Sequence, residues 1–298
     1  MGGTTIARRA RWAGVVAALV LAPALAPAGA AVGSPRRTDP GAATASGLST
    51  AQRRQLAARH AFTTRPITFL LLGDSLALTF GIGLADHAVP RYGVDLNDQA
   101  VLGCDLDADL LIRGAGKVGP ATPGCPHWRW FWPQLIRTER PAVVGLLLGR
   151  WYDYDHFYDG QWVHVGEPAW DAHVEGELEQ AVGILSAGGA RVVLFTQPYV
   201  DPPLTAGQTE PWPENDPIRT DAYNEIVRRV VAHDARHTAL LIDLNRLLDP
   251  DGHFTMTIGP TRVRWLDGIH VAFAGGVLVQ RSVLPTVAAL GLRRPAGA

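Results

Sequence analysis

The stretch Ile67-Thr68-Phe69-Leu70-Leu71-Leu72 runs directly into Gly73-Asp74-Ser75-Leu76. A continuous apolar run of this length with a β-branched start is typical of a parallel strand that is buried on both faces. The glycine that follows permits a sharp turn, so the serine is left at the carboxyl end of the strand. Open α/β sheets bind their ligands at that end. Ser75 is therefore the first candidate for a functional side chain.

A second informative stretch lies near the C-terminus, where Asp267 and His270 are separated by two residues. This spacing lets the two side chains lie close together on a loop or in a first helical turn. A serine hydroxyl is a weak nucleophile unless a base accepts its proton, and an imidazole oriented by a carboxylate is such a base. The three residues are the minimum set for acyl transfer through serine. The alternative is a helix-capping serine and an Asp–His pair in a solvated loop.

Taken together, the two stretches resemble the SGNH, or GDSL-type, hydrolase and esterase superfamily. Its first sequence block is Gly-Asp-Ser-Leu after the first strand, and its last block is Asp-x-x-His near the C-terminus. The resemblance implies that Ser75 is the nucleophile, His270 the general base and Asp267 the residue that orients the base. It also implies a three-layer α/β/α sandwich with a parallel, flavodoxin-like sheet. No metal or organic cofactor is expected for such a reaction.

Two further blocks of that superfamily concern the donors that stabilise the oxyanion. The backbone N–H of Ser75 is one candidate donor, and Gly103 matches the block II glycine, although it could equally be a turn glycine. Block III departs from the pattern, because the segment Gly149-Arg150-Trp151-Tyr152-Asp153 has tryptophan where asparagine is usual. Losing one oxyanion donor costs about 2.7–4 kcal/mol of transition-state stabilisation. We therefore expect the Arg150 guanidinium or the Trp151 indole N–H to replace the asparagine.

The departure in block III narrows the resemblance. A Gly-Cys pair after the second strand, a second cysteine, several tryptophans and Gly-x-Trp after the third strand are similar to the SGNH domains appended to membrane acyltransferase-3 proteins of actinobacteria. Those domains act in O-acylation of envelope glycans. The resemblance implies an O-acylated, in particular O-acetylated, envelope glycan as substrate, with a lipid or a small ester as alternatives.

The N-terminal residues have the features of a secretory signal. Three arginines at positions 8–11 precede an apolar segment at 13–25, and Ala28-Gly29-Ala30 forms an A-x-A cleavage site. Pro23 and Pro27 interrupt the apolar segment, which favours cleavage over a retained membrane anchor. We expect a secreted or cell-envelope protein without stable membrane insertion after cleavage.

Export makes the cysteines interpretable, since Cys104 and Cys125 are the only two. In an oxidising compartment such a pair most simply forms one disulfide, which would contribute about 3 kcal/mol by closing its loop. Two isolated cysteines lack the C-x-x-C spacing of a zinc site. The acidic stretch 153–159 does not complete an EF-hand, and we expect it to be a solvated loop. No metal site is predicted.

Three regions follow from composition: a signal peptide at 1–30, a disordered linker with a short helix at 31–62, and one hydrolase-like domain at 63–298. Within the domain, strand-like and helix-like segments alternate, which predicts a parallel sheet covered on both faces. Strands are expected at 67–72, 94–101, 142–148, 191–196 and 239–243, and helices at 76–88, 128–140, 170–187, 221–235 and 272–290. The proline-rich segment 197–217 is expected to be a loop that either lines the site or lies on the surface.

The charge balance argues against a nucleic-acid partner, because the formal net charge is only −1. Trp151 and Trp265 are the site candidates among the nine tryptophans, by their position near the blocks. The sequence thus predicts a secreted serine esterase in which water completes the reaction, or an acyltransferase if a sugar hydroxyl is the acceptor. The alternative from another class is a catalytically weak glycan-binding protein. The sequence makes no prediction of oligomeric state.

Overall fold

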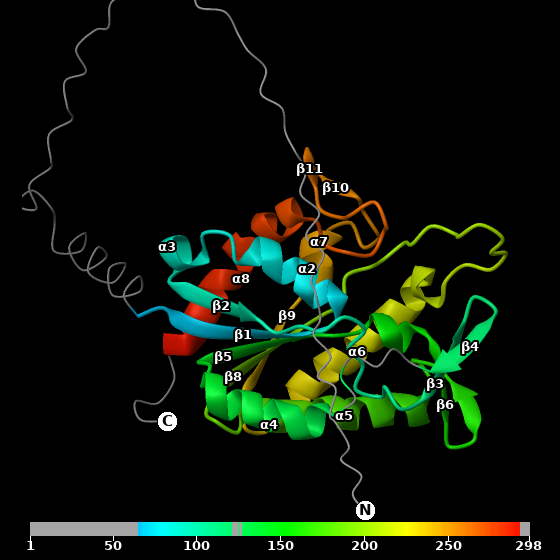
Figure 1. The fold of residues 1–298 in the computed structure, drawn as a ribbon, viewed down its shortest axis with the longest axis horizontal. Coiled ribbons are helices and arrows are strands. Elements are labelled where there is room, and N and C mark those ends of the chain that lie inside the picture. The colour runs from blue at the N-terminus through cyan, green and yellow to red at the C-terminus, as the bar shows by residue number, and fades with distance from the viewer. Residues whose placement is uncertain (1–64, 121–124, 126, 293–298) are drawn as a thin grey trace, which may run out of the picture. The chain divides into compact units, whose positions relative to one another are not determined.

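The centre of the fold is a sheet of five parallel strands in the order β2-β1-β5-β8-β9 (Figure 1). Numbered by their sequence within this sheet, the strands have the order 2-1-3-4-5, which is that of flavodoxin-like folds. The predicted fold class is therefore confirmed. The strands are β1 (Ile67–Gly73), β2 (Val94–Asp98), β5 (Val143–Leu147), β8 (Arg191–Phe195) and β9 (Ala239–Ile242).

This computed structural model describes residues 65–120, 125 and 127–292. The predicted signal peptide at 1–30 and the linker and short helix at 31–62 lie outside the described residues, so they stay predictions.

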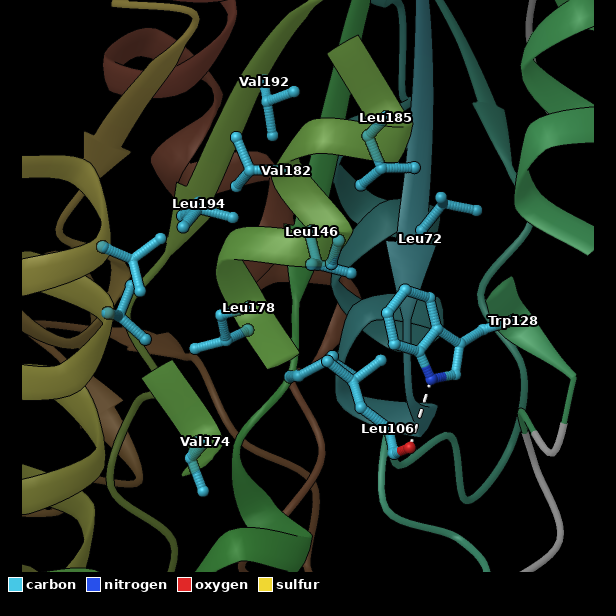
Figure 2. Packing of buried hydrophobic residues seen from close by; sticks show 14 of the residues in the cluster. Leu72, Leu106, Trp128, Leu146, Val174, Leu178, Val182, Leu185, Val192 and Leu194 are labelled. Atoms are coloured by element: carbon cyan, nitrogen blue, oxygen red, sulfur yellow. Dashed lines mark hydrogen bonds between the residues drawn. The ribbon is translucent and has the colours of Figure 1, made fainter. Parts of the chain in front are cut away.

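Helices cover both faces of the sheet because successive residues of a strand such as β1 are apolar and point to opposite faces. Phe69 and Leu71 of β1 pack in the cluster formed with α2 (Ser75–Leu84) and α8 (Phe273–Leu292). Leu70 and Leu72 point to the other face, into the cluster formed with α4, α5 and α6. Figure 2 shows part of that second cluster, which includes Leu72 of β1, Leu146 of β5 and Leu178 of α5. Burial on both faces explains the unbroken apolar runs in the sequence.

The helices of the second face are α4 (Trp128–Glu139), α5 (Pro168–Ser186) and α6 (Pro217–His233). The last of these begins four residues earlier than predicted, because the Asp216 side chain caps it by accepting from the Ile218 N–H at 3.0 Å.

The helix predicted at 76–88 is too long at its C-terminal end. The chain leaves α2 at Leu84 and re-enters a helix at α3 (Ala88–Tyr92) only after His87, which has a left-handed backbone with φ 52°. A short helix α7 (Leu244–Leu248) was not predicted.

A four-stranded antiparallel sheet, ordered β4-β3-β6-β7, was missed by the sequence analysis. Its strands are β3 (Leu111–Gly114), β4 (Lys117–Pro120), β6 (Asp155–Tyr158) and β7 (Gln161–Val163). Both hairpins turn through two residues with positive φ, Ala115-Gly116 and Asp159-Gly160. Asp-Gly is a strong hairpin signal, so the second turn was readable in the sequence. The smallest sheet pairs β10 (Thr257–Ile258) with β11 (Thr261–Arg262).

The expectation of a solvated loop at 153–159 is therefore wrong. Strand β6 lies within it, and His156 is fully buried. The His156 ring stacks on Tyr152 and Trp170, with centroids 5.9 and 4.7 Å away, and its Nδ1 lies 3.1 Å from the Tyr154 carbonyl. The segment is buried through these aromatic contacts, which its acidic composition does not indicate.

The predicted disulfide between Cys104 and Cys125 is confirmed. It joins the loop after β2 to the residues before α4. In the same region the Trp128 indole N–H donates to the Leu106 carbonyl at 3.1 Å, as Figure 2 shows.

Among the described helices, α8 alone is long and apolar enough to cross a membrane, with a mean hydropathy of 1.4. Its residues Val279, Val283 and Val287 are buried in the cluster shared with α2. This is the packing of a core helix.

Candidate active site

The turn after β1 carries Ser75 at the carboxyl edge of the sheet. Gly73 has φ 142° and lies so close to the Leu147 carbonyl of β5 that a Cβ at this position would overlap it. Asp74 caps α2, because its Oδ1 accepts the Leu76 N–H at 2.8 Å. Ser75 is then the first residue of the helix and is 9% exposed. It lies between β1 and β5, where the strand order reverses and α/β sheets bind ligands.

A turn from Arg264 to Val271 brings Asp267 and His270 into direct contact. The Asp267 Oδ1 accepts the backbone N–H groups of Ile269 and His270 at 2.9 and 3.0 Å. The other oxygen, Oδ2, lies 2.7 Å from the His270 Nδ1.

The electrostatics of this pair determine which imidazole nitrogen can act as a base. Partial burial raises the pKa of Asp267, but hydrogen bonds from the His270 ring and from the two backbone N–H groups outweigh it and hold that pKa below its ordinary value. An ionised carboxylate can only accept, so the His270 Nδ1 carries the proton. The lone pair is then on Nε2, as a general base requires.

The catalytic-type turn is anchored on both sides. Arg264 and Val271 form an antiparallel bridge across its base, and the Trp265 N–H donates to the His270 carbonyl at 2.8 Å. The tip is held by the Asp201 N–H, which donates to the Gly268 carbonyl at 2.8 Å. The proline-rich segment 197–217 therefore contacts the site directly, as one of the two sequence interpretations expected.

A fully buried ion pair lies at the base of this turn. The Arg264 Nη2 binds the Asp249 Oδ2 at 2.7 Å, and the same carboxylate oxygen accepts the Tyr199 N–H at 3.0 Å. The sequence analysis did not find either charged residue, because their positions carry no pattern.

The turn with Ser75 and the turn with His270 are within electrostatic range of each other. Burial raises the pKa of Asp74 to about 6, against the hydrogen bond from Leu76 and the positive charges of Arg150 and His270, which lower it. The side chains of Arg150 and His270 are thus close enough to Asp74 for their charges to act on it.

The block II turn adjoins the same point, because the Val101 N–H donates to the Gly73 carbonyl at 2.9 Å. Gly103 lies in that turn, is buried, and has φ 71°. The structure thus brings Gly103 beside the nucleophile turn, while its role as an oxyanion donor stays a prediction.

The two candidates in block III have different surroundings. The Arg150 Nε and Nη2 both donate to the Glu214 Oε1, at 3.0 and 2.7 Å. Burial lowers the pKa of Arg150, but Glu214, Tyr154 and Asp74 together raise it above its ordinary value. Its charge is thus permanent and is already matched by a buried carboxylate.

Trp151, by contrast, has an unused donor. Its ring packs on Tyr154 at 5.6 Å between centroids and under the Arg150 guanidinium at 4.6 Å. Its Nε1 is buried and has no hydrogen-bond partner among the described residues. An indole N–H can only donate, and burying it without an acceptor is unfavourable. Trp151 is therefore the better candidate for the missing donor.

Below block III lies a buried polar layer that the sequence analysis missed. Asp153 accepts the Gln197 Nε2 at 2.6 Å, and Gln197 exchanges two backbone hydrogen bonds with the Asn224 side chain, at 2.7 and 2.9 Å. Burial raises the pKa of Asp153 well above its ordinary value, although the bond from Gln197 lowers it. Gly149 has φ 147° and no room for a Cβ beside the Gln197 amide oxygen. The buried polar layer thus holds the backbone of block III in place at Gly149 and Asp153.

One group among the described residues has ligand types and spacing suited to a metal: Glu175, Glu179 and His233. It lies on the outer surface of α5 and α6. Glu175 is already bound by Arg229 and His233, each at 2.9 Å. These contacts are those of a surface ion-pair network.

Trp265 precedes Asp267 by two residues and is 55% exposed. It lies in the same turn as Asp267 and His270, and its backbone N–H donates to the His270 carbonyl.

Comparison with known proteins identifies the family and the fold. Residues 68–286 match the model of a family described as "Protein of unknown function (DUF459)". No curated protein matches the sequence.

Among solved structures, one similar chain is LAE5, an α/β hydrolase enzyme from the metagenome of Lake Arreo, Spain, with 16% identity, a TM-score of 0.49 and coverage of 75% of this chain and 96% of that one. Another is Axe2, an acetylxylan esterase from Geobacillus stearothermophilus, with 15% identity, a TM-score of 0.45 and coverage of 74% and 94%. A third is the acetyl xylan esterase AlAXEase, with 15% identity, a TM-score of 0.46 and coverage of 74% and 100%. At these identities the likeness concerns the fold.

Proposed function

The chain belongs to the DUF459 family of proteins of unknown function, and we propose that it is a serine ester hydrolase of the SGNH type. The observation that supports this most is the Asp267–His270 hydrogen bond of 2.7 Å in a turn whose charge reaches the residue next to Ser75. In this proposal Ser75, at the edge of the sheet where ligands bind, is the nucleophile, His270 is the base and Asp267 orients the base.

In the proposed reaction, the Ser75 Oγ forms a bond to the ester carbonyl carbon while its proton moves to the His270 Nε2. The tetrahedral intermediate collapses, the carbon–oxygen bond of the alcohol breaks, and His270 returns the proton to the leaving alkoxide. Water then attacks the acyl-serine, with His270 accepting its proton and passing it to the Ser75 Oγ. If a sugar hydroxyl takes the place of water, the same steps transfer the acyl group.

The oxyanion needs donors positioned before the reaction. We assign the Ser75 backbone N–H, which is in the first turn of α2 and so has no acceptor within the helix. The Trp151 indole N–H is the second, since it is buried without an acceptor among the described residues. Gly103 contributes a third from the block II turn. Arg150, which stays paired with Glu214, adds a positive charge that favours the oxyanion.

The proposed substrate is an O-acetyl ester on an envelope glycan, met outside the cytoplasm after removal of residues 1–30. This part of the proposal rests on the sequence resemblance and on the signal-like N-terminus. The mechanism itself requires only an acyl ester.

Covalent labelling by a fluorophosphonate probe tests the proposal. The purified protein should be labelled, and both Ser75→Ala and His270→Ala should abolish labelling while keeping the thermal unfolding transition. Ser282→Ala, on the exposed side of α8, is the matched control and should be labelled like the parent protein.

Absence of labelling in the folded parent protein would contradict an activated Ser75. The glycan-binding alternative would then lead, and glycan binding unchanged by Ser75→Ala would support it.

A further inference from the structure

A groove of about 870 Å³ lies at the small antiparallel sheet. One wall is the β3–β4 hairpin, including Arg113, and the other is the segment 210–217 ahead of α6, including Trp212. The volume is at the upper end of the range for small-molecule sites. Figure 1 shows the hairpin and the start of α6 next to each other at one end of the fold.

A series of contacts links one wall of the groove to Arg150. Its wall residue Gly114 packs so closely against Pro213 and Tyr154 that a Cβ would lie 2.5 and 2.7 Å from them. The residue after Pro213 is Glu214, which holds Arg150, and the charge of Arg150 reaches Asp74.

A second connection runs to the turn that carries the base. The Asn215 Nδ2, in the groove wall, donates to the Asp201 Oδ1 at 2.6 Å and to the Pro202 carbonyl at 3.1 Å. Asp201 in turn holds the Gly268 carbonyl. Hydrogen bonds thus link the groove wall, through Asp201, to the turn that carries Asp267 and His270.

The charges of the groove favour an uncharged, polar ligand. Arg113 and Arg219 both bind Asp155, each with an N–O distance of 2.7 Å. Glu210 and Asp216 add two carboxylates to the lining, and the Lys117 Nζ lies 5.8 Å from the centroid of the Trp212 ring. Three cationic and three carboxylate groups therefore balance, and a groove without net charge does not attract phosphates or polyanions.

The lining contains both donors, on Arg113 and Arg219, and acceptors, on Asp155 and Glu210. A hydroxyl group can use both, since it both donates and accepts. The Trp212 ring adds an apolar surface and is held by its own N–H, which donates to the Pro203 carbonyl at 3.3 Å. A ring with C–H groups on its faces and hydroxyls at its edge satisfies both features.

We propose that this groove binds the sugar chain of a neutral glycan and so presents its acyl ester to Ser75. The inference rests on the proposed esterase function. It adds that the glycan chain is held in this groove and that neutral glycans are accepted.

The test compares a small ester with an acylated glycan. The probes are p-nitrophenyl acetate and neutral O-acetylated oligosaccharides of increasing length, with an O-acetylated polyuronate as the anionic counterpart. In the parent protein, kcat/KM should rise with oligosaccharide length and should be lower for the polyuronate.

Trp212→Ala and Glu210→Ala should each raise KM for the long oligosaccharides about tenfold, the factor that corresponds to about 1.4 kcal/mol. Neither should change kcat/KM for p-nitrophenyl acetate. Trp130→Ala is the matched control, because Trp130 is 68% exposed on α4 and does not line the groove. It should leave both substrates unaffected.

Binding without turnover separates this inference from the esterase proposal. Calorimetry with the Ser75→Ala variant and the same oligosaccharides should show binding that Trp212→Ala weakens about tenfold. Binding that is insensitive to Trp212 and Glu210, or a preference for the polyuronate, would overturn the groove assignment even if Ser75 is active. Loss of all Ser75-dependent hydrolysis with intact, Trp212-dependent binding would overturn the esterase proposal and keep the groove.

Discussion

At the scale of single residues, most polar groups of the candidate site already have hydrogen-bond partners, and one buried donor has none among the described residues. Asp267 is fully engaged by the His270 ring and two backbone N–H groups, and Arg150 is engaged by Glu214. The Trp151 Nε1 alone among the block III donors lacks an acceptor among the described residues. A buried donor left unpaired in the resting protein is available to an anion that forms only during the reaction.

Replacing Trp151 by phenylalanine tests this assignment. The variant keeps an aromatic ring beside Tyr154 and removes the N–H together with part of the indole, so we expect it to lose about 0.5–3 kcal/mol of stability. If the N–H stabilises the oxyanion, kcat for p-nitrophenyl acetate should fall by about 10²–10³-fold with KM nearly constant.

Trp265→Phe is the matched control for that measurement, since the same substitution is made there at a residue that is 55% exposed. A kcat for Trp151→Phe equal to that of the control would exclude the indole as a donor.

At the scale of elements, the position of His270 depends on a turn that packs closely against the backbone of a neighbouring segment. Gly268 has φ 70°, and a Cβ there would overlap the Asp201 carbonyl. Because the same glycine accepts the Asp201 N–H, the turn holding the base and the proline-rich segment fit together only with glycine at this position.

Gly268→Ala should therefore displace the turn without unfolding the protein. A displacement of about 1 Å at the base can lower the rate about 10²-fold, so we expect kcat/KM for p-nitrophenyl acetate to fall by one to two orders of magnitude.

Gly259→Ala provides the control for backbone strain alone. Gly259 also has a positive φ, 55°, but nothing lies within 4 Å of its Cβ position. It should lose a similar amount of stability and keep its activity. Equal activities in the two variants would show that the position of the turn does not limit the reaction.

At the scale of the whole molecule, buried carboxyl groups make stability depend on pH. Burial raises the pKa of Asp74 and of Asp98 to about 6, above the ordinary value of 3.8. Between these pH values the folded protein binds more protons than the unfolded chain, so the free energy of unfolding falls as pH rises through this window. His173 acts in the same direction, because the hydrogen bond with Asp107 raises its pKa.

Asp74→Asn should remove part of this pH dependence. Asparagine still accepts the Leu76 N–H as a helix cap but carries no charge to bury. Urea unfolding at pH 4.5 and 7.5 should show a smaller loss of stability in the variant than in the parent, by about 2 kcal/mol.

Asp95→Asn, on an exposed position of β2, should behave like the parent protein. A pH dependence in Asp74→Asn that is as steep as in the parent would show that Asp74 is ionised throughout this range in the folded state.

The sequence by itself determined the features that arise from neighbouring residues or from strong periodicity. The apolar run before Ser75 predicted β1, and the alternation of strands and helices predicted the parallel sheet, because burial on both faces demands those patterns. The pairing of Cys104 with Cys125 followed from their number, and the contact of Asp267 with His270 from their short separation.

Only the tertiary structure decided the partners that lie far apart in the chain. Arg150 meets Glu214 across 64 positions, and Asp153 meets Gln197 across 44. Single buried polar residues leave no periodic signal, and their partners depend on how loops pack over the sheet. The same holds for the groove beside Trp212, which exists because the small antiparallel sheet and the proline-rich segment come together in three dimensions.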